Sequence, residues 1–333
     1  MERVLVSEHI TSGAWADRPL EGSLAVEGRA MLVALARDLS ADPGVEVVTT
    51  WDARLGPFPV ETVEVEVVES VAASDKAFGR LAGESDRTLV IAPEVDGLLE
   101  QRCEQVDAAG GRWIGCRRSA IAICSDKLAT AAHLQQHGIA VVDTRTADQP
   151  RPDSDSVVWK PRDGAGSMEI RVRPADQPPP HPDHVVQPLL DGRPVSVAVL
   201  VSGSDITCLP VAEQFVGDDG HFAYRGGLVP CLPIQSPSSR DVARLAADAC
   251  RSIEGLEGWV GVDLLLDRRQ VPIVLEINPR LTTSFLGYRQ LARFPLGRLT
   301  VFPEQSPGEF LPGDWHSEVI EFTSSGTPAT CLQ

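Results

Sequence analysis

Lysine is rare in this chain, and two of its three lysines stand where they could hold a phosphate. The sequence contains 30 lysine and arginine residues, and only Lys76, Lys127 and Lys160 are lysines. In so arginine-rich a chain, a lysine marks a place where a compact ammonium group is wanted. Lys127 follows Ser125-Asp126 at the start of an expected helix, where the helix dipole already favours anions. A solvated helix lysine is the alternative for Lys127.

Lys160 ends a short apolar strand and precedes a glycine-rich loop. The sequence there runs Trp159-Lys160-Pro161-Arg162-Asp163-Gly164-Ala165-Gly166-Ser167. Backbone N–H groups in such a loop can approach a phosphate closely, because glycine has no side chain to obstruct them. A plain turn has the same composition, so the loop is a weak signal by itself.

Two apolar strands further along the chain carry three polar residues that suit magnesium. Val260–Leu266 and Val271–Ile277 are expected to form a hairpin. Strand side chains alternate between faces, so Glu276 and Asn278 share one face, with Asp263 on the partner strand. Two carboxylates and an amide oxygen suit Mg²⁺, which prefers oxygen ligands. A solvent-exposed face of the hairpin is the alternative. Two cations and three oxygen ligands together indicate ATP chemistry.

Charge and composition argue against several classes of protein. The chain has 333 residues and a formal net charge of −17, and so acidic a surface repels nucleic acid and anionic lipid. No apolar run approaches the roughly 18 residues needed to span a bilayer, and the N-terminal Met-Glu-Arg-Val-Leu-Val predicts a strand rather than a signal peptide. Seven cysteines without a Cys-x-x-Cys pair indicate reduced thiols. We therefore expect a cytoplasmic protein that binds neither nucleic acid nor membrane.

The first hundred residues alternate strands with helices, which predicts a parallel sheet with right-handed crossovers. Strands are expected at Arg3–Ser7, Val45–Thr50, Val60–Val68 and Thr88–Pro93. Helices are expected at Ser23–Leu39, with Ser23 as N-cap, and at Ser74–Ala82 and Glu94–Ala109.

A second unit is expected to begin near Arg112. Ser125 or Asp126 is predicted to cap a helix that ends at His137. Residues 145–156 and 174–184 are rich in proline and aspartate and predict exposed loops. Besides the hairpin, this unit is expected to contain strands at Ile139–Thr144, Val185–Leu190 and Val195–Val201 and a helix at Ser236–Ile253.

The order and spacing of these motifs resemble the ATP-grasp superfamily of carboxylate–amine ligases over about residues 112–300. The set that carries the resemblance is Gly115, Ser125-Asp126-Lys127, Gly138-Ile139, Lys160-Pro161, Gly164-Ala165-Gly166, Gln187 to Gly192, Asp263 and Glu276 to Arg280. The runs Ser7–Gly13, Glu21–Met31 and Asn278–Ser284 look like one branch of that superfamily. The branch contains the tyramine–L-glutamate ligases of methanofuran biosynthesis and their bacterial relatives in one-carbon metabolism.

The resemblance implies an α/β fold with an N-terminal parallel domain at 1–111 and a two-lobed ATP-grasp domain. Its small lobe would cover 112–185, and its large lobe, with α+β character and the Mg/ATP site, 186–333. The implied cofactors are ATP and Mg²⁺, with two ions expected and Mn²⁺ as a substitute. The implied phosphate ligands are Lys127 and Lys160, under a mobile loop that includes Gly164, Gly166 and Ser167. The implied adenine hinge is Gln187, Leu189 and Leu190, and the implied metal ligands are Asp263, Glu276 and Asn278.

Arg280 and Lys160 are the implied catalytic residues, and Arg280 would steady an acyl phosphate. The sequence departs from the family at the ribose position, where many members have a glutamate and this chain has Arg193-Pro194. Asp191 is the expected substitute. Candidate substrate residues are Glu8 and Glu27 in the N-terminal domain, Thr283, and Tyr224 and Arg225 in a loop that would be a lid, a pocket wall or an ordinary loop.

The implied reaction joins an amino-acid carboxylate, L-glutamate by resemblance, to an amine such as tyramine. It would proceed through an acyl phosphate and release ADP and phosphate. A small-molecule kinase and a non-catalytic ATP-binding protein are the alternatives. The identity of both substrates stays open, as does the oligomeric state, with a homodimer among the options.

Overall fold

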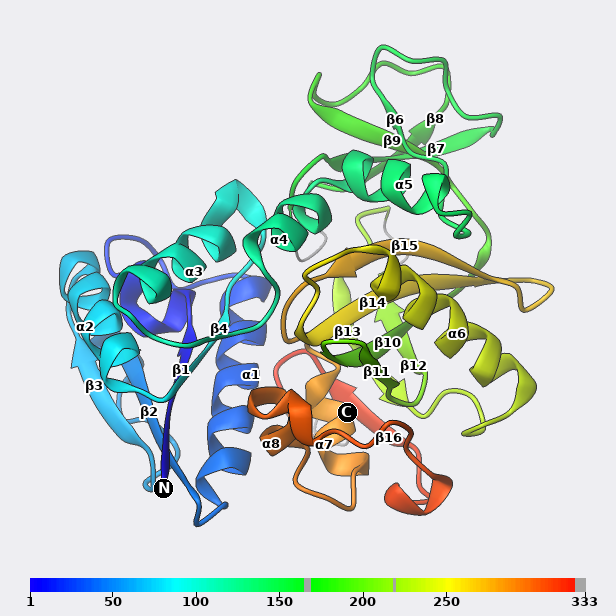
Figure 1. Ribbon diagram of the computed structural model, residues 1–333. Helices are drawn as coiled ribbons and strands as arrows, with labels where there is room; N and C mark the ends of the chain where they lie inside the picture. Colours follow the sequence, from blue (N-terminus) through cyan, green and yellow to red (C-terminus); the bar gives the residue numbers. More distant parts are fainter. Residues whose placement is uncertain (165–168, 218–219, 327–333) are drawn as a thin grey trace, which may run out of the picture.

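Three β-sheets organise the chain, and Figure 1 shows them in the computed structural model. The structure describes residues 1–164, 169–217 and 220–326. A five-stranded sheet, blue and cyan in Figure 1, lies on one side of the molecule. A four-stranded sheet, in green, lies at the top, and a seven-stranded sheet, in green, yellow and red, forms the other side. The chain therefore has three sheet-based units that surround a common centre.

The five-stranded sheet is parallel, with strand order β3-β2-β1-β4-β5. Its strands are β1 (Glu2–Glu8), β2 (Val45–Asp52), β3 (Glu64–Val68), β4 (Arg87–Ile91) and β5 (Trp113–Ile114). The accompanying helices are α1 (Ser23–Ser40), α2 (Val71–Glu84) and α3 (Leu98–Ala108). The inner strands β1 and β4 are almost wholly buried, as expected where helices cover both faces of a sheet. The predicted parallel α/β domain is confirmed.

Two short helices lead into the four-stranded antiparallel sheet. Asp126 separates α4 (Arg118–Ser125) from α5 (Lys127–Gln136), and its carboxylate accepts the N–H groups of Leu128 and Ala129. Asp126 therefore caps α5, because it satisfies two donors that the helix leaves free. The sheet has the order β6-β9-β7-β8 and consists of β6 (Arg145–Thr146), β7 (Ser156–Pro161), β8 (Arg171–Pro174) and β9 (His184–Pro188).

The seven-stranded sheet has the order β15-β14-β10-β12-β13-β16, and β11 pairs with β10. Its first four strands in chain order are β10 (Gly192–Ser202), β11 (Asp205–Cys208), β12 (Ala212–Val216) and β13 (Tyr224–Val229). The remaining three are β14 (Gly258–Asp267), β15 (Pro272–Asn278) and β16 (Ile320–Thr323). The helices of this unit are α6 (Pro237–Ser252), α7 (Phe285–Leu291) and α8 (Leu296–Val301). The expected hairpin is present as β14 and β15.

Helix α1 joins the N-terminal sheet to the C-terminal helices. Leu32 and Leu35 of α1 are fully buried in one apolar cluster with Leu296 and Val301 of α8. Figure 1 shows α1 between the first sheet and these helices. Burial of each large apolar side chain stabilises such a contact by roughly 1.5–3 kcal/mol. The contact fixes the N-terminal domain against the part of the chain that follows the hairpin.

Several predicted boundaries were wrong. The predicted strand Ile139–Thr144 forms only an isolated bridge, between Val141 and Val274, and the paired strand β6 starts later. The third strand starts at Glu64 rather than Val60, because a turn bond joins the N–H of Val63 to the carbonyl of Val60. The bridge and the turn provide hydrogen bonds to backbone groups in these two segments. These groups therefore need no partner strand.

The helix predicted from Glu94 starts instead at Leu98. Asp96 and Gly97 have φ angles of 53° and 67°, and this left-handed backbone ends the short turn Val95–Gly97 before the helix begins. Ser125 is not the cap of α5 either, because it ends α4 and its hydroxyl donates to the carbonyl of Ile121.

Other boundaries shift by smaller amounts. Gly22, rather than Ser23, precedes α1 as its cap residue and forms no side-chain cap bond. Residues 145–146, within a predicted loop, form β6. Strands β9 and β10 belong to different sheets, so residues 189–191 connect two units.

The division into 1–111, 112–185 and 186–333 stays a prediction. Strand β5 belongs to the first sheet and ends at Ile114, whereas β9 belongs to the second and ends at Pro188. Boundaries just after these two residues would keep each sheet whole. Among the described residues, none of the helices is long and apolar enough to cross a membrane.

Candidate active site

A cavity of about 360 Å³ lies where the three sheet-based units approach one another. Its volume falls within the roughly 300–1,000 Å³ that small-molecule sites occupy. Fourteen predicted site residues line it: Glu8, Glu27, Lys127, Lys160, Gly164, Gln187, Leu189, Leu190, Tyr224, Asp263, Glu276, Asn278, Arg280 and Thr283. Residues that are almost three hundred positions apart in the sequence therefore share one site.

Four predicted site residues are not placed in this cavity. Gly166 and Ser167 lie outside the described residues. Asp191 is exposed and paired with Arg268, and Arg225 is exposed on β13. Neither Asp191 nor Arg225 is among the described lining residues, so this arrangement does not place Asp191 where it could replace the missing ribose ligand.

The hairpin brings two carboxylates together at one end of the cavity. Asp263 of β14 lies directly opposite Glu276 of β15. The amide of Asn278 donates to Asp263 Oδ2 at 3.0 Å, and the amide of Gln214 on β12 donates to Asp263 Oδ1 at 2.9 Å. Burial and the neighbouring charge of Glu276 raise the pKa of Asp263 to about 6. Two acids held this close favour a cation as their partner.

This donor set includes an amide as well as carboxylates. No group of three or more histidine, cysteine, aspartate or glutamate side chains is arranged for a metal ion in the described part of the chain. The amide of Asn278 uses an N–H group in its bond to Asp263, so its oxygen is the atom that can serve as a ligand. Two carboxylates and one amide oxygen are enough for Mg²⁺, which usually keeps waters or phosphate oxygens as further ligands.

Both lysines predicted to bind phosphate stand beside these carboxylates. The ammonium of Lys127, in the first turn of α5, lies 3.3 Å from Glu276 Oε1 and donates to the carbonyl of Gly164 at 2.9 Å. Lys160 stands near the end of β7. Burial lowers the pKa of Lys160, and the carboxylate of Glu276 opposes that shift. We call Lys127, Lys160, Asp263, Glu276 and Asn278 the lysine end of the cavity.

Arg280 follows the hairpin and reaches the N-terminal domain. Its Nε lies 2.9 Å from Glu94 Oε1, and both side chains are largely buried. Glu94 lies in the segment between β4 and α3 and is not among the described lining residues, whereas Arg280 is. Glu94 therefore contacts Arg280 from behind the cavity wall.

The segment between β9 and β10 forms another wall. Gln187 donates to Thr144 Oγ1 at 3.0 Å, and the N–H of Leu189 donates to the carbonyl of Ser156 at 3.0 Å. Leu189 and Leu190 stay 39% and 38% exposed, which leaves apolar surface facing the cavity. Such a wall suits the flat apolar face of a base.

A second acidic part of the cavity lining comes mainly from the N-terminal domain. Glu8 at the end of β1 accepts the N–H of Ile10 at 3.1 Å and the N–H and hydroxyl of Thr11 at 2.7 and 2.6 Å. Burial outweighs these bonds and raises the pKa of Glu8 to about 7. Gly28 leaves the room for this carboxylate, since a Cβ there would lie 2.5 Å from the Glu8 carboxyl carbon.

Glu27 of α1 is the second acid of this end. Thr283 donates its hydroxyl to Glu27 Oε2 at 2.7 Å, and Oε1 is buried and accepts no hydrogen bond from the described residues. Burial raises the pKa of Glu27. We call Glu8, Glu27 and Thr283 the N-terminal end of the cavity. An unsatisfied buried carboxylate oxygen is costly, so Glu27 is an acid whose hydrogen bonding is incomplete among the described residues.

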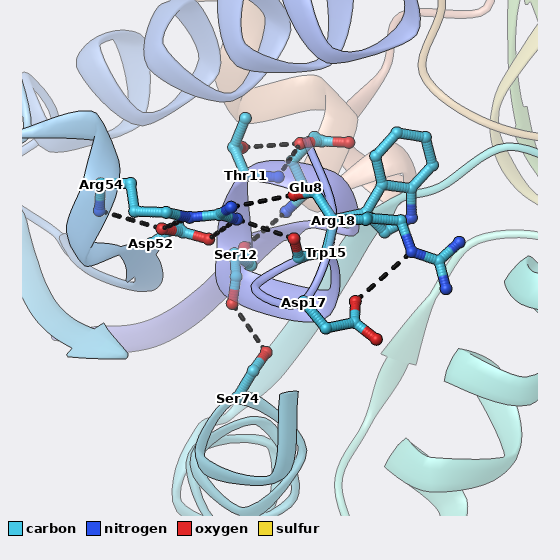
Figure 2. Close-up of polar contacts among 9 residues, drawn as sticks. All are labelled: Glu8, Thr11, Ser12, Trp15, Asp17, Arg18, Asp52, Arg54 and Ser74. Atoms are coloured by element: carbon cyan, nitrogen blue, oxygen red, sulfur yellow. Dashed lines mark hydrogen bonds and ion pairs between the residues drawn. The ribbon is translucent and has the colours of Figure 1, made fainter. Parts of the chain in front are cut away.

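The turn that carries Glu8 is held in place from its outer side, as Figure 2 shows. Arg54 pairs with Asp52 at 2.7 Å and donates to the carbonyls of Trp15 and Arg18 at 2.7 and 2.9 Å. Charge-assisted bonds of this kind are stronger than neutral ones. The loop after β1 is therefore anchored to β2, and Glu8 keeps a fixed position.

Sequence patterns did not predict two residues that contact the site. Gln214 lies in a strand with no motif around it, and nothing in the sequence signals its bond to Asp263. The sequence pattern predicts Glu94 at the start of a helix, which in the structure begins at Leu98. Its position directly after Pro93, at the carboxyl end of a buried parallel strand, was the signal that could have revealed it.

Family comparisons agree with this geometry. Residues 124–284 match the ATP-grasp domain, and residues 45–121 match the pre ATP-grasp 3 domain. The first match contains Lys127, Lys160 and the whole hairpin, which together form the lysine end. The chain belongs to the ATP-grasp superfamily.

Individual relatives indicate which branch of the superfamily this ATP-grasp protein resembles. It is 27% identical over 204 residues to a tyramine–L-glutamate ligase of Methanocaldococcus fervens, covering 61% of this chain and 62% of the relative. It is 28% identical to the tyramine–L-glutamate ligase of Methanocaldococcus jannaschii, covering 61% of this chain and 58% of the relative. The alignments thus span about three fifths of the length of these curated relatives. The ATP-grasp chain resembles this branch, as its motifs indicated.

A solved structure matches nearly the whole chain. An ATP-grasp superfamily protein from Archaeoglobus fulgidus superposes with a TM-score of 0.72 and 27% identity. The match covers 97% of this chain and all of that one. The ATP-grasp fold therefore extends through all three sheets.

Proposed function

We propose that the protein is an ATP-dependent ligase that joins an amino-acid carboxylate to an amine. The observation that carries the proposal is one cavity lined by two different sets of charged residues. Lysines and a carboxylate pair form one set, and two buried acids with an unsatisfied oxygen form the other. Three sheets would bring a nucleotide, an acid and an amine together, and such positioning can supply a large part of a rate enhancement.

Asp263, Glu276 and Asn278 would hold magnesium. Their fit rests on the register that places Asp263 opposite Glu276 and on the contact of Asn278 with Asp263, which together gather three oxygen donors. Mg²⁺ takes few carboxylates together with substrate phosphate oxygens, which matches this small donor set. Bound there, Mg²⁺ would supply neutralisation of phosphate charge. The proposal includes two such ions, with Mn²⁺ as a substitute.

The chain's own cations would orient the reacting groups. Lys127 and Lys160 would hold the α- and β-phosphates of ATP, with adenine on the wall at 187–190. Transfer of the γ-phosphoryl group to a substrate carboxylate oxygen would give an acyl phosphate and ADP. Arg280 has a planar guanidinium that suits a carboxylate or an acyl phosphate. Preorganised cations of this kind stabilise the charge that develops during the transfer.

The N-terminal end would receive the amine. Glu8 and Glu27 would attract the ammonium form, and Thr283 and Tyr224 would shape the pocket. Attack of the free amine on the acyl carbon would form the amide bond, and inorganic phosphate would leave with the electrons of the broken C–O bond and with the proton that the nitrogen loses. By similarity to the Methanocaldococcus ligases, the proposed pair is L-glutamate and tyramine or a related amine. Such a reaction fits the ATP-containing cytoplasm, where we propose the protein acts.

A phosphate-release screen of amino acids against amines tests this function. We expect phosphate release only when ATP, Mg²⁺, an acid and an amine are all present, with an amide detected by mass spectrometry. Phosphorylated acceptor without amide would favour a kinase. Absence of turnover with every pair, despite ATP binding, would favour a non-catalytic role. Turnover with other acids but none with glutamate would keep the ligase and remove this substrate.

A further inference from the structure

Glu94 occupies an unusual place for an acid. It lies in the segment that leaves β4 at the carboxyl end of the N-terminal sheet, and it is only 5% exposed. Pro93 beside it lines the cavity, whereas Glu94 is not among the described lining residues. A buried carboxylate is costly unless a partner compensates its charge. The identity of that partner therefore indicates why the acid is there.

The partner is Arg280. Glu94 Oε1 lies 2.9 Å from Arg280 Nε, and neither Glu94 oxygen accepts a directed hydrogen bond from the described residues. The guanidinium also donates through Nη1 to the carbonyl of Leu281 at 3.3 Å. Its Nε edge thus faces the N-terminal domain. The side chain still lines the cavity, where it can bind a second anion.

The segment around Glu94 also touches the loop after Lys160. The N–H of Asp96 donates to Asp163 Oδ2 at 3.3 Å. Asp96 and Gly97 are held in left-handed backbone, which turns the chain sharply before α3. One short segment of the N-terminal domain therefore contacts both Arg280 and the turn between Lys160 and Gly164.

We propose that Glu94 is a positioning residue that acts through Arg280. This inference rests on the ligase function proposed above. Glu94 holds the Nε edge of the guanidinium, so that the other edge faces the carboxylate that becomes the acyl phosphate. A site that must hold its geometry closely needs supporting groups of this kind behind the residues that touch the substrate. Glu94 itself touches no reacting atom.

The test compares Glu94→Gln with a matched change in another ion pair. That pair also joins the N-terminal domain to the part of the chain that follows the hairpin. Asp38 of α1 pairs with Arg289 of α7, and neither lines the cavity. We expect Glu94→Gln to lower kcat about 10- to 100-fold, as loss of an outer partner does at metal sites, with the KM for ATP within about twofold. Asp38→Asn should leave kcat within about twofold of the wild type. Equal losses in both variants would overturn the proposal, since Glu94 would then only join domains.

A double-mutant cycle with Arg280→Lys separates action through Arg280 from any other role. Lysine lacks the planar fork, so Glu94 has no edge left to orient. In that background, Glu94→Gln should add less than about a twofold further loss of kcat. A full additional loss would show that Glu94 acts elsewhere. Glu94→Asp should recover part of the activity, and melting temperatures will identify any variant that does not fold.

A second readout does not depend on turnover. Phenylglyoxal modifies accessible arginines, and mass spectrometry can follow modification of Arg280. We expect faster modification in Glu94→Gln than in the wild type, and no change in Asp38→Asn. If the protein proves not to be a ligase, this result still shows whether Glu94 holds Arg280. An unchanged rate in Glu94→Gln would overturn the positioning role.

Discussion

The lysine end and the N-terminal end of the cavity both bury carboxylates, but they balance that charge differently. At the lysine end, Lys127 lies 3.3 Å from Glu276 and neighbouring amides donate to Asp263. At the N-terminal end, hydroxyl and backbone N–H groups compensate Glu8, and Glu27 keeps one buried oxygen without a donor among the described residues. Under the proposed function, the first end would bind phosphate together with a metal ion, and the second would bind the cationic amine.

Removal of the Lys160 charge at the lysine end should give the largest effect. Lys160→Met keeps the apolar stem and removes the charge near the end of β7. Loss of one preorganised contact to developing charge costs about 10²- to 10³-fold in kcat, so we expect ATP turnover to fall by that factor. The control is Lys76→Met, on the exposed side of α2. Equal turnover in the two variants, measured as ADP release, would remove Lys160 from the site.

The second-largest effect should be weaker metal binding when the carboxylates of the lysine end are neutralised. In Glu276→Gln and Asp263→Asn the amides keep the shape but remove anionic charge that a hard divalent ion needs. We expect Mn²⁺ affinity, measured by calorimetry with ADP present, to fall at least about 10- to 100-fold, the range seen when only an outer partner of a ligand is lost. Glu213→Gln, on the same sheet but paired with Arg193, serves as control. Unchanged titration curves would contradict the metal site.

A smaller and more selective effect is expected at the N-terminal end. Glu27→Gln removes the charge of the carboxylate whose Oε1 lacks a donor among the described residues. A charge-assisted hydrogen bond contributes about 1.5–3 kcal/mol, so the KM for the amine should rise about tenfold or more, while the KM for ATP stays unchanged. If the KM for ATP rises instead, the two ends do not divide the substrates as the comparison requires.

The last predicted effect concerns stability rather than turnover. Burial raises the folded-state pKa of Glu8 from 4.5 to about 7. The folded protein thus binds this proton more tightly, so Glu8 stabilises the fold most below pH 4.5, and that stability is lost as the pH rises to about 7. In Glu8→Gln the side-chain amide stays uncharged at every pH, so the variant does not lose stability in this way. At about 1.4 kcal/mol per pKa unit, urea unfolding should show the variant gaining roughly 3 kcal/mol over the wild type across this window.

Glu61→Gln is the control for that measurement, because Glu61 is an acid whose side chain is exposed. The difference between Glu61→Gln and the wild type should not change over the same pH window. If Glu8→Gln follows Glu61→Gln, burial does not perturb Glu8 as described.

Local patterns indicated which residues of the lysine end lie close together, whereas their binding roles stay predictions. The alternation of side chains along the two hairpin strands placed Glu276 and Asn278 on one face, and the register puts Asp263 opposite Glu276. Lys127 and Lys160 were singled out because lysine is rare in the chain, and both line the cavity. These features depend on residues close in sequence, whose geometry follows from the strand or helix itself.

Contacts between domains could not be predicted in the same way. The pairing of Glu94 with Arg280 depends on how the first sheet packs against the third, which no local pattern encodes. The segment Ile139–Thr144 has a strand-like composition, but it only bridges to Val274 and forms no strand, because pairing depends on the neighbours available. The family motif predicts Asp191 as the substitute ribose ligand, but its partner in the structure is Arg268.

The bond between Thr283 and Glu27 has a consequence for how the protein is made. It joins residues 256 positions apart. During synthesis, the first sheet can fold early, because domains generally fold as units from the N-terminus. The wall of the site around Glu27 stays open until the segment around Thr283 has left the ribosome. An unfinished chain that ends before Thr283 therefore presents a folded N-terminal domain in which Glu27 still lacks this hydrogen bond.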